Sequence, residues 1–352
     1  MELPFLSSLN VDSSGHDHEN ADYTVNAPNL CEFRYHGMLD HVFLVPFENL
    51  VKFTLESFVM ETHEVLDLLS HVPQLEICDI VNVDPPTMRL ETPELPVVVL
   101  GKLRSLSVRG LEVSDMASLI QHLDVPLSAT LSFKTYGDDP PATTIEDFVA
   151  TFLADAKGLS ISFKLTYHES ETTYALTSHS RNKISIKQSL CNEEALKYPE
   201  FEALSRQKTS ITTLTLHSLT LPIRSSLIEA LGFWTLLTRI EVFTDETEFE
   251  KLLIALEAAP EPICPQLRTL NCSGTRFSST RMKYFLQYRK DHGVPLQELE
   301  ITKGFAEPNV HAFVSLIPTL TEFDPDLSRC GFDSPWIKKC NCNLGHRDEP
   351  FS

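Results

Sequence analysis

One stretch of the chain comes within a single residue of a metal-binding signature. That signature places two histidines four residues apart on one helical face, with a glutamate after the first as general base. Here the stretch reads His63-Glu64-Val65-Leu66-Asp67, so aspartate stands where the second histidine belongs. We interpret it as a helix with a solvated acidic face.

Two further groups have ligand chemistry without suitable spacing or setting. His16-Asp17-His18 follows a polar run of serine and glycine, which indicates an exposed loop. One residue separates Cys340 from Cys342, fewer than zinc knuckles typically have. We predict no metal, no cofactor, and a flexible C-terminal tail over 326–352. The tail contains the potential ligands Cys330, Cys340, Cys342 and His346.

The sequence lacks the short motifs that mark nucleotide or catalytic sites. Its twelve glycines include no Gly-x-Gly, and no Gly-x-Ser-x-Gly elbow occurs. We therefore predict that the protein is not an enzyme. An enzyme with a site dispersed over loops is the alternative, and a pocket with convergent acids or bases would favour it.

The charge balance disfavours two classes of partner. With 49 acidic and 29 basic residues, the formal net charge is −20. This charge opposes phosphate backbones and anionic lipids, so we expect no nucleic acid and no membrane as partners. No apolar run reaches the roughly 18 residues of a membrane span, no secretory signal is visible, and the cysteines imply no disulfide framework. We expect an intracellular protein, cytoplasmic or nuclear.

A repeated phrase predicts the elements that would position a binding surface. It reads leucine-x-x-leucine-x-leucine or a close variant, and it recurs about every 20 to 30 residues where it is most regular. Such a period is typical of a solenoid, because one unit has too little apolar surface to bury alone. The phrases are Leu50-x-x-Phe53-x-Leu55, Leu103-x-x-Leu106-x-Val108, Ile211-x-x-Leu214-x-Leu216, Leu237-x-x-Ile240-x-Val242, Leu267-x-x-Leu270-x-Cys272, Leu296-x-x-Leu299-x-Ile301, and an opening version at Leu3, Leu6 and Leu9.

Most phrases lead into an amphipathic helical stretch. After the second phrase, Ser114 is predicted as the N-cap of a helix that buries Met116 and Leu119. We predict an α/β fold, a leucine-rich-repeat solenoid over residues 1–325, with a mostly parallel sheet on one face and helices on the other. The aromatic residues on the helical stretches are expected in the core, namely Phe233, Trp234, Phe249 and Phe285.

Two features predict an irregular solenoid. The usual repeat has asparagine or cysteine three residues beyond the strand, where Phe58, Leu111 and Leu219 stand here. In the middle of the chain, apolar residues alternate strictly from Leu159 to Tyr167, and two short runs follow. We predict a central antiparallel insertion over about 164–206 and a solenoid held mainly by apolar packing.

A protein partner is expected on the strand face, where the variable positions of each phrase point outward. These positions are short or charged and include no aromatic anchor, so no hot spot can be named. The candidate partner-binding residues are Arg104, Ser105, Ser107, Thr213, Thr215, Arg239, Glu241, Arg268, Thr269, Asn271, Glu298 and Glu300.

Three phrases carry a family resemblance: Val72-Pro73-Gln74-Leu75-Glu76, Leu103-Arg104-Ser105-Leu106-Ser107-Val108 and His122-Leu123-Asp124-Val125-Pro126. With them, roughly residues 1–325 resemble the leucine-rich-repeat portion of the F-box-like family of basidiomycete fungi. The resemblance implies a non-catalytic protein-interaction scaffold, similar to the substrate-binding half of a ubiquitin-ligase adaptor.

The F-box itself is not visible. Leu3-Pro4 matches the start of an F-box, but a strand phrase follows in place of the expected helices. A ligase core is thus expected as a partner only if an F-box exists upstream. A stand-alone repeat protein unrelated to ubiquitination is the remaining alternative.

Overall fold

The computed structural model describes most of the chain between residues 3 and 324. The predicted loop at His16-Asp17-His18 and the tail over 326–352, with its four potential ligands, lie outside the described residues. The described residues are 3–12, 23–37, 42–45, 48–57, 61–83, 95–136, 145–153, 156–165, 170–178, 183–190, 204, 210–258, 261–307 and 311–324.

One sheet of 14 strands runs through the described chain. Its strands lie nearly in chain order and pair in parallel, except where β12 meets its two neighbours. The predicted large, mostly parallel sheet is therefore confirmed. The order is β1 (Ser8–Asp12), β3 (Glu32–His36), β5 (Lys52–Ser57), β6 (Ile77–Asn82), β8 (Ser105–Arg109), β10 (Thr130–Tyr136), β13 (Ile184–Leu190), β12 (Ser170–Ser178), β11 (Ala156–Leu165), β14 (Thr213–Ser218), β15 (Arg239–Phe243), β16 (Thr269–Asn271), β18 (Glu298–Thr302) and β20 (Thr319–Phe323).

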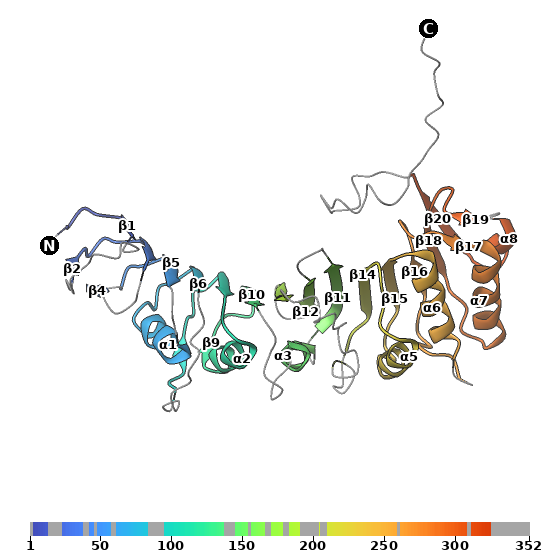
Figure 1. The fold of residues 1–352 in the computed structure, drawn as a ribbon, viewed down its shortest axis with the longest axis horizontal. Coiled ribbons are helices and arrows are strands. Elements are labelled where there is room, and N and C mark those ends of the chain that lie inside the picture. The colour runs from blue at the N-terminus through green and yellow to red at the C-terminus, as the bar shows by residue number, and fades with distance from the viewer. Residues whose placement is uncertain are drawn as a thin grey trace, which may run out of the picture.

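The helices cover one face of this sheet. Figure 1 shows a curved row of units with the strands along its upper, inner side and the helices along its lower, outer side. The arrangement is α/β, as predicted, with successive strand–helix units stacked side by side. The helices are α1 (Thr62–Ser70), α2 (Val113–Gln121), α3 (Ile145–Leu153), α5 (Arg224–Phe233), α6 (Glu246–Leu256), α7 (Ser279–Asp291) and α8 (His311–Val314).

Three small parallel sheets of two strands complete the described elements. Two of them contact the helices, which places them on the helical side of the molecule. No helix in the described part of the chain is long and apolar enough to cross a membrane. The small sheets are β2 (Tyr23–Asn26) with β4 (Val42–Val45), β7 (Val98–Val99) with β9 (Leu123–Asp124), and β17 (Phe277–Ser278) with β19 (Ala306–Glu307).

The core lies between the sheet and the helices, and the strand phrases explain it. In β15, Ile240 and Val242 are buried while the residues between and around them are half-buried, because successive side chains of a strand point to opposite faces. Ile240 pairs in register with Leu214 of β14 and with Leu270 of β16, and all three are fully buried. The apolar positions of the phrases thus form continuous rows beneath the helices.

The middle of the sheet reverses its strand order. β12 runs antiparallel to β11 and β13, while β13 pairs with β10 and β11 pairs with β14, both in parallel. The antiparallel segment starts with β11 at Ala156, before the predicted boundary at 164, because the alternating run is itself the first of its three strands. Tyr174 of β12 donates a 2.6 Å hydrogen bond to the buried carboxylate of Glu146, which ties this segment to α3.

Two predictions about the helices are wrong. The N-cap of α2 is Glu112 and not Ser114, so the helix begins two residues earlier than predicted, at Val113, which is buried. Phe233 is 60% exposed, although the other three aromatic residues predicted in the core are buried. In α5 the buried stripe contains Leu227, Leu231 and then Trp234 at helical spacing, and Phe233 lies one position away from that stripe.

Some backbone groups near the ends of the strands bond to side-chain hydroxyls. Buried polar side chains, most of them hydroxyls, lie at or near the C-terminal ends of several strands, mostly one residue before the position that asparagine or cysteine usually takes. Thr275 accepts a hydrogen bond from the Thr244 backbone N–H at 3.1 Å and donates one to the Val242 carbonyl at 3.1 Å. Thr302 accepts one from the Gly274 backbone N–H at 2.8 Å. The buried polar residues at or near the ends of strands include Ser57, Asn82, Thr135, Thr244, Thr275 and Thr302.

Candidate binding face on the sheet

The face of the large sheet that points away from the helices, called here the strand face, carries the predicted partner-binding residues. Eight of them fall into two rows that the pairing register aligns across four neighbouring strands. Arg104, Ser105 and Ser107 lie at β8, separated from these rows by β10, β13, β12 and β11. Arg268 lies just before β16. One row is Thr213, Arg239, Thr269 and Glu298, and the other is Thr215, Glu241, Asn271 and Glu300.

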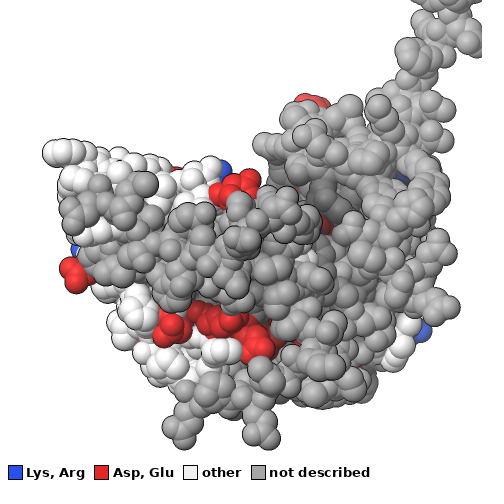
Figure 2. Space-filling view, turned by 60° about the vertical axis from the view of Figure 1, so that its left-hand side comes forward, with Lys and Arg blue, Asp and Glu red and all other residues white. Residues whose placement is uncertain are grey.

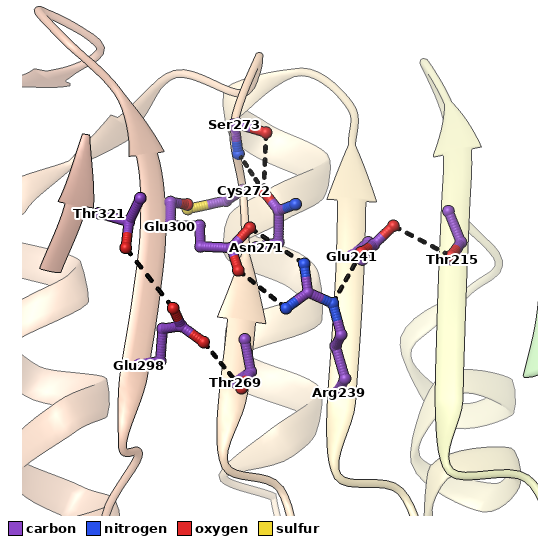
Figure 3. Close-up of polar contacts among 10 residues, drawn as sticks. All are labelled: Thr215, Arg239, Glu241, Thr269, Asn271, Cys272, Ser273, Glu298, Glu300 and Thr321. Atoms are coloured by element: carbon purple, nitrogen blue, oxygen red, sulfur yellow. Dashed lines mark hydrogen bonds and ion pairs between the residues drawn. The ribbon is translucent and has the colours of Figure 1, made fainter. Parts of the chain in front are cut away.

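Arg239 joins β15 to β18 (Figure 3). Its Nη1 and Nη2 donate to the two carboxylate oxygens of Glu300 at 2.8 and 3.0 Å, and its Nε donates to Glu241 at 2.7 Å. The guanidinium reaches across β16 to do so, because Glu300 lies two strands away on β18. These hydrogen bonds, led by those to Glu300, raise the pKa of Arg239 above its ordinary value.

A third carboxylate on these strands, Glu298, bonds to hydroxyls and not to Arg239. Among the described residues its contacts are the hydroxyls of Thr269 and Thr321, which donate to it at 3.4 and 3.5 Å. Asn271 is used locally, because its side-chain oxygen accepts hydrogen bonds from the backbone N–H and hydroxyl of Ser273 just beyond β16. Figure 3 shows these groups side by side on the strand face.

Sequence reasoning missed the polar residues of four strands. The phrases chosen did not include β3, β6, β10 and β20, although Cys78-x-Ile80 and Leu131-x-Phe133 contain the alternating part of the phrase. These strands add charged groups to the strand face. An Arg109–Asp79 pair at 2.9 Å joins β8 to β6, and a Lys52–Glu32 pair at 2.6 Å joins β5 to β3.

Other side chains with potential chemistry are placed apart from this cluster. His63 lies on α1 and pairs with Glu61 at 3.1 Å. Among the described residues, no group of three or more His, Cys, Asp or Glu is placed to hold a metal ion. Burial lowers the pKa of His217, whose ring lies edge-on to that of Phe243 with centroids 6.2 Å apart. Burial also raises the pKa of the Cys264 thiol to about 12, so this thiol stays protonated.

A pocket among the described residues lies on the helical side. It sits between α6 and α7 and is lined by apolar groups such as Phe249 and Phe277, together with Glu246, Glu250 and Arg281. That arginine donates to both carboxylate oxygens of Glu257 at 2.8 and 2.7 Å. Both faces of the molecule therefore have a bidentate arginine–carboxylate pair, and the strand face has in addition the aligned rows of polar residues.

The bidentate pair of Arg239 and Glu300 should contribute measurably to stability. We expect Glu300→Gln to lower the free energy of unfolding by about 1–3 kcal/mol, because it leaves a half-buried guanidinium without its bidentate partner. Urea denaturation measures the loss. Glu298→Gln is the matched control, since Glu298 lies on the same strand and face but contacts only hydroxyls, and it should cost much less. Equal losses for the two variants would contradict this assignment of the charge pair.

The fold and this face together define an α/β protein of stacked strand–helix units with a polar strand face. No family model matches the chain, and no curated protein matches it. Among solved structures, it is similar to an internalin from Listeria monocytogenes, with 11% identity, 90% of this chain and 86% of that chain covered, and a TM-score of 0.29. A TM-score this low adds nothing to the fold derived from the strand pairing. None of these comparisons supports the F-box-like family.

Proposed function

We propose that the protein is a non-catalytic scaffold that binds another protein on its strand face. The observation that carries the proposal is the Arg239 cluster, a set of outward-facing charged and hydroxyl side chains on five strands that hydrogen bonds hold in place. Its members are Thr215, Arg239, Glu241, Thr269, Glu298, Glu300 and Thr321. Side chains already ordered in the free protein lose little further entropy on binding. A curved sheet face with helices behind it is also the surface that repeat proteins generally use for partners.

The repeat phrases support a more specific class, the leucine-rich-repeat solenoid. Each phrase supplies one parallel strand of the sheet, and most are followed by a helix on the outer side. Within that class we propose a role like that of the substrate-binding half of an F-box-type ubiquitin-ligase adaptor, supported by the resemblance of three sequence phrases. Such a role needs an F-box joined to this chain, and without one the protein is a stand-alone binder.

Site-specific photo-crosslinking tests the scaffold function. A photoreactive amino acid is placed at Thr213 or Ser105 on the strand face, and at Glu229 or Lys283, which are exposed on α5 and α7, as matched controls. In extract of the source organism, we expect discrete crosslinked proteins from the first two positions only. An excess of unmodified chain should remove these products. Crosslinks that arise equally from both sides, or from the helices alone, would contradict a strand-face scaffold.

A further inference from the structure

Three basic residues lie in one row on the strand face. Arg109 of β8 pairs in register with Lys134 of β10, and Lys134 pairs with Lys187 of β13. Adjacent strands are about 4.8 Å apart, and like charges directly opposite each other on neighbouring strands repel. The fold thus keeps three consecutive cations together in a chain whose formal net charge is −20.

Two carboxylates beside this row form solvent-exposed ion pairs with its cations. Asp79 lies 2.9 Å from Arg109, and Glu171 lies 3.7 Å from Lys187. The Arg109 and Lys187 side chains are 44% and 41% exposed, so each pair is worth only about 0–1 kcal/mol. Carboxylates of a partner can compete for Arg109 and Lys187 at little cost.

A row of hydroxyl groups lies next to the cations. Ser107, Ser132 and Ser185 occupy the same three strands, two residues before Arg109, Lys134 and Lys187, and they pair in register with one another. Since residues two apart on a strand share a face, the six side chains form one surface, called here the basic strip. Each of them can donate a hydrogen bond, as recognition of an oxyanion requires.

The basic strip contrasts with the outer surface. Figure 2 shows the largest group of Asp and Glu in the lower half of the view, the side where Figure 1 places the helices, with few Lys or Arg visible on the described surface. The strip contains no aromatic side chain on which a nucleobase could stack. Its chemistry therefore favours carboxylates of a protein over a nucleic acid.

We propose that the basic strip binds an acidic segment of a protein partner, with carboxylate side chains laid across β8, β10 and β13. The three cations span about 10 Å, and carboxylates two residues apart on an extended segment are about 7 Å apart, so two of them can be shared among three cations. This inference rests on the proposed function, since it names the partner chemistry of the same face.

A labelled peptide of alternating glutamate and serine is the probe. Fluorescence anisotropy is measured at about 0.15 M salt, where the Debye length of about 8 Å screens the long-range repulsion from the rest of the acidic chain. The Lys134→Gln/Lys187→Gln variant should bind at least about tenfold more weakly than the unmodified protein. Lys283→Gln/Lys290→Gln on α7 is the matched control with the same charge change, and it should bind within about twofold of the unmodified protein.

The outcomes separate this inference from the proposed function. Equal losses in the two variants would overturn the basic strip, because they would show a general charge effect. A peptide in which glutamine replaces glutamate should not bind, and equal binding of that peptide would also overturn it. Tighter binding of a single-stranded oligonucleotide than of the acidic peptide would contradict a protein partner. If Thr213 and Ser105 crosslink a protein but the acidic peptide does not bind, the basic strip is wrong and the scaffold stands. If neither occurs, both fail.

Discussion

Replacing Arg289 with methionine should lower the free energy of unfolding by about 3 kcal/mol or more. Arg289 is fully buried near the end of α7, and within the described part of the chain its guanidinium donates only to backbone carbonyls. Its Nε donates to Val294 at 3.1 Å, its Nη1 to Ile263 at 3.2 Å, and its Nη2 to Cys264 and Leu267 at 3.1 and 3.4 Å. Methionine fills similar space but leaves these carbonyls without their donor.

Two readouts test this role. Urea denaturation gives the free energy of unfolding, and Lys290→Met is the matched control, since Lys290 is exposed in the same turn of α7. The second readout is the Cys264 thiol, which is 1% exposed and lies in the loop that Arg289 holds. We expect thiol reagents to react with Cys264 faster in Arg289→Met. An unchanged Cys264 rate together with a stability loss no larger than that of Lys290→Met would refute the role.

Arg289 also shows where sequence reasoning stops. A basic residue in the last turn of a helix is ordinarily exposed, where it favours the helix dipole. Here burial lowers the pKa of Arg289 below its ordinary value, and the guanidinium stays charged because the ordinary pKa of arginine is so high. The residues that need it, Ile263, Cys264 and Leu267, are distant in sequence, and Cys264 has a positive φ of 51°. No local sequence pattern predicts a contact between the Arg289 guanidinium and carbonyls so distant in the chain.

The parts of the fold that followed from sequence are those that a local period encodes. The phrase around Leu214 predicted both its strand and its inward direction, because alternation along a strand is a property of the strand alone. The reversed order of β11, β12 and β13 was not predictable in the same way. Alternation from Leu159 to Tyr167 marks a strand, but the choice of neighbour depends on tertiary pairing.

The residues of the candidate site also differ in whether a local sequence pattern could identify them. The outward positions of the phrases include Arg239, Glu241 and Glu300, and the pairing register places the three on neighbouring strands of the same face. The basic strip was missed because Lys134 and Lys187 lie on strands outside the regular phrases. Their alignment with Arg109 needs the placement of β13 beside β10, which the reversed order of the insertion creates. The insertion thus shapes the strand face as well as the topology.

Leu214→Asp should destabilise the protein strongly, by about 3 kcal/mol or more. Leu214 is fully buried in β14, between Leu159 of β11 and Ile240 of β15, which are also buried. A carboxylate there has no cation partner and loses its hydration. Burial must raise its folded pKa above the unfolded value, so the penalty grows as pH rises between the two values and should be smaller at pH 4 than at pH 7.

Thr213→Asp provides the matched control for this prediction. Thr213 is the preceding residue of β14, faces outward and pairs in register with Arg239, so a carboxylate there stays hydrated and lies near a cation. Urea denaturation of both variants should show a large loss for Leu214→Asp and a change within about 0.5 kcal/mol for Thr213→Asp. Similar losses for the two variants would contradict the facing of β14, since a one-residue shift in register exchanges the buried and exposed positions of a strand.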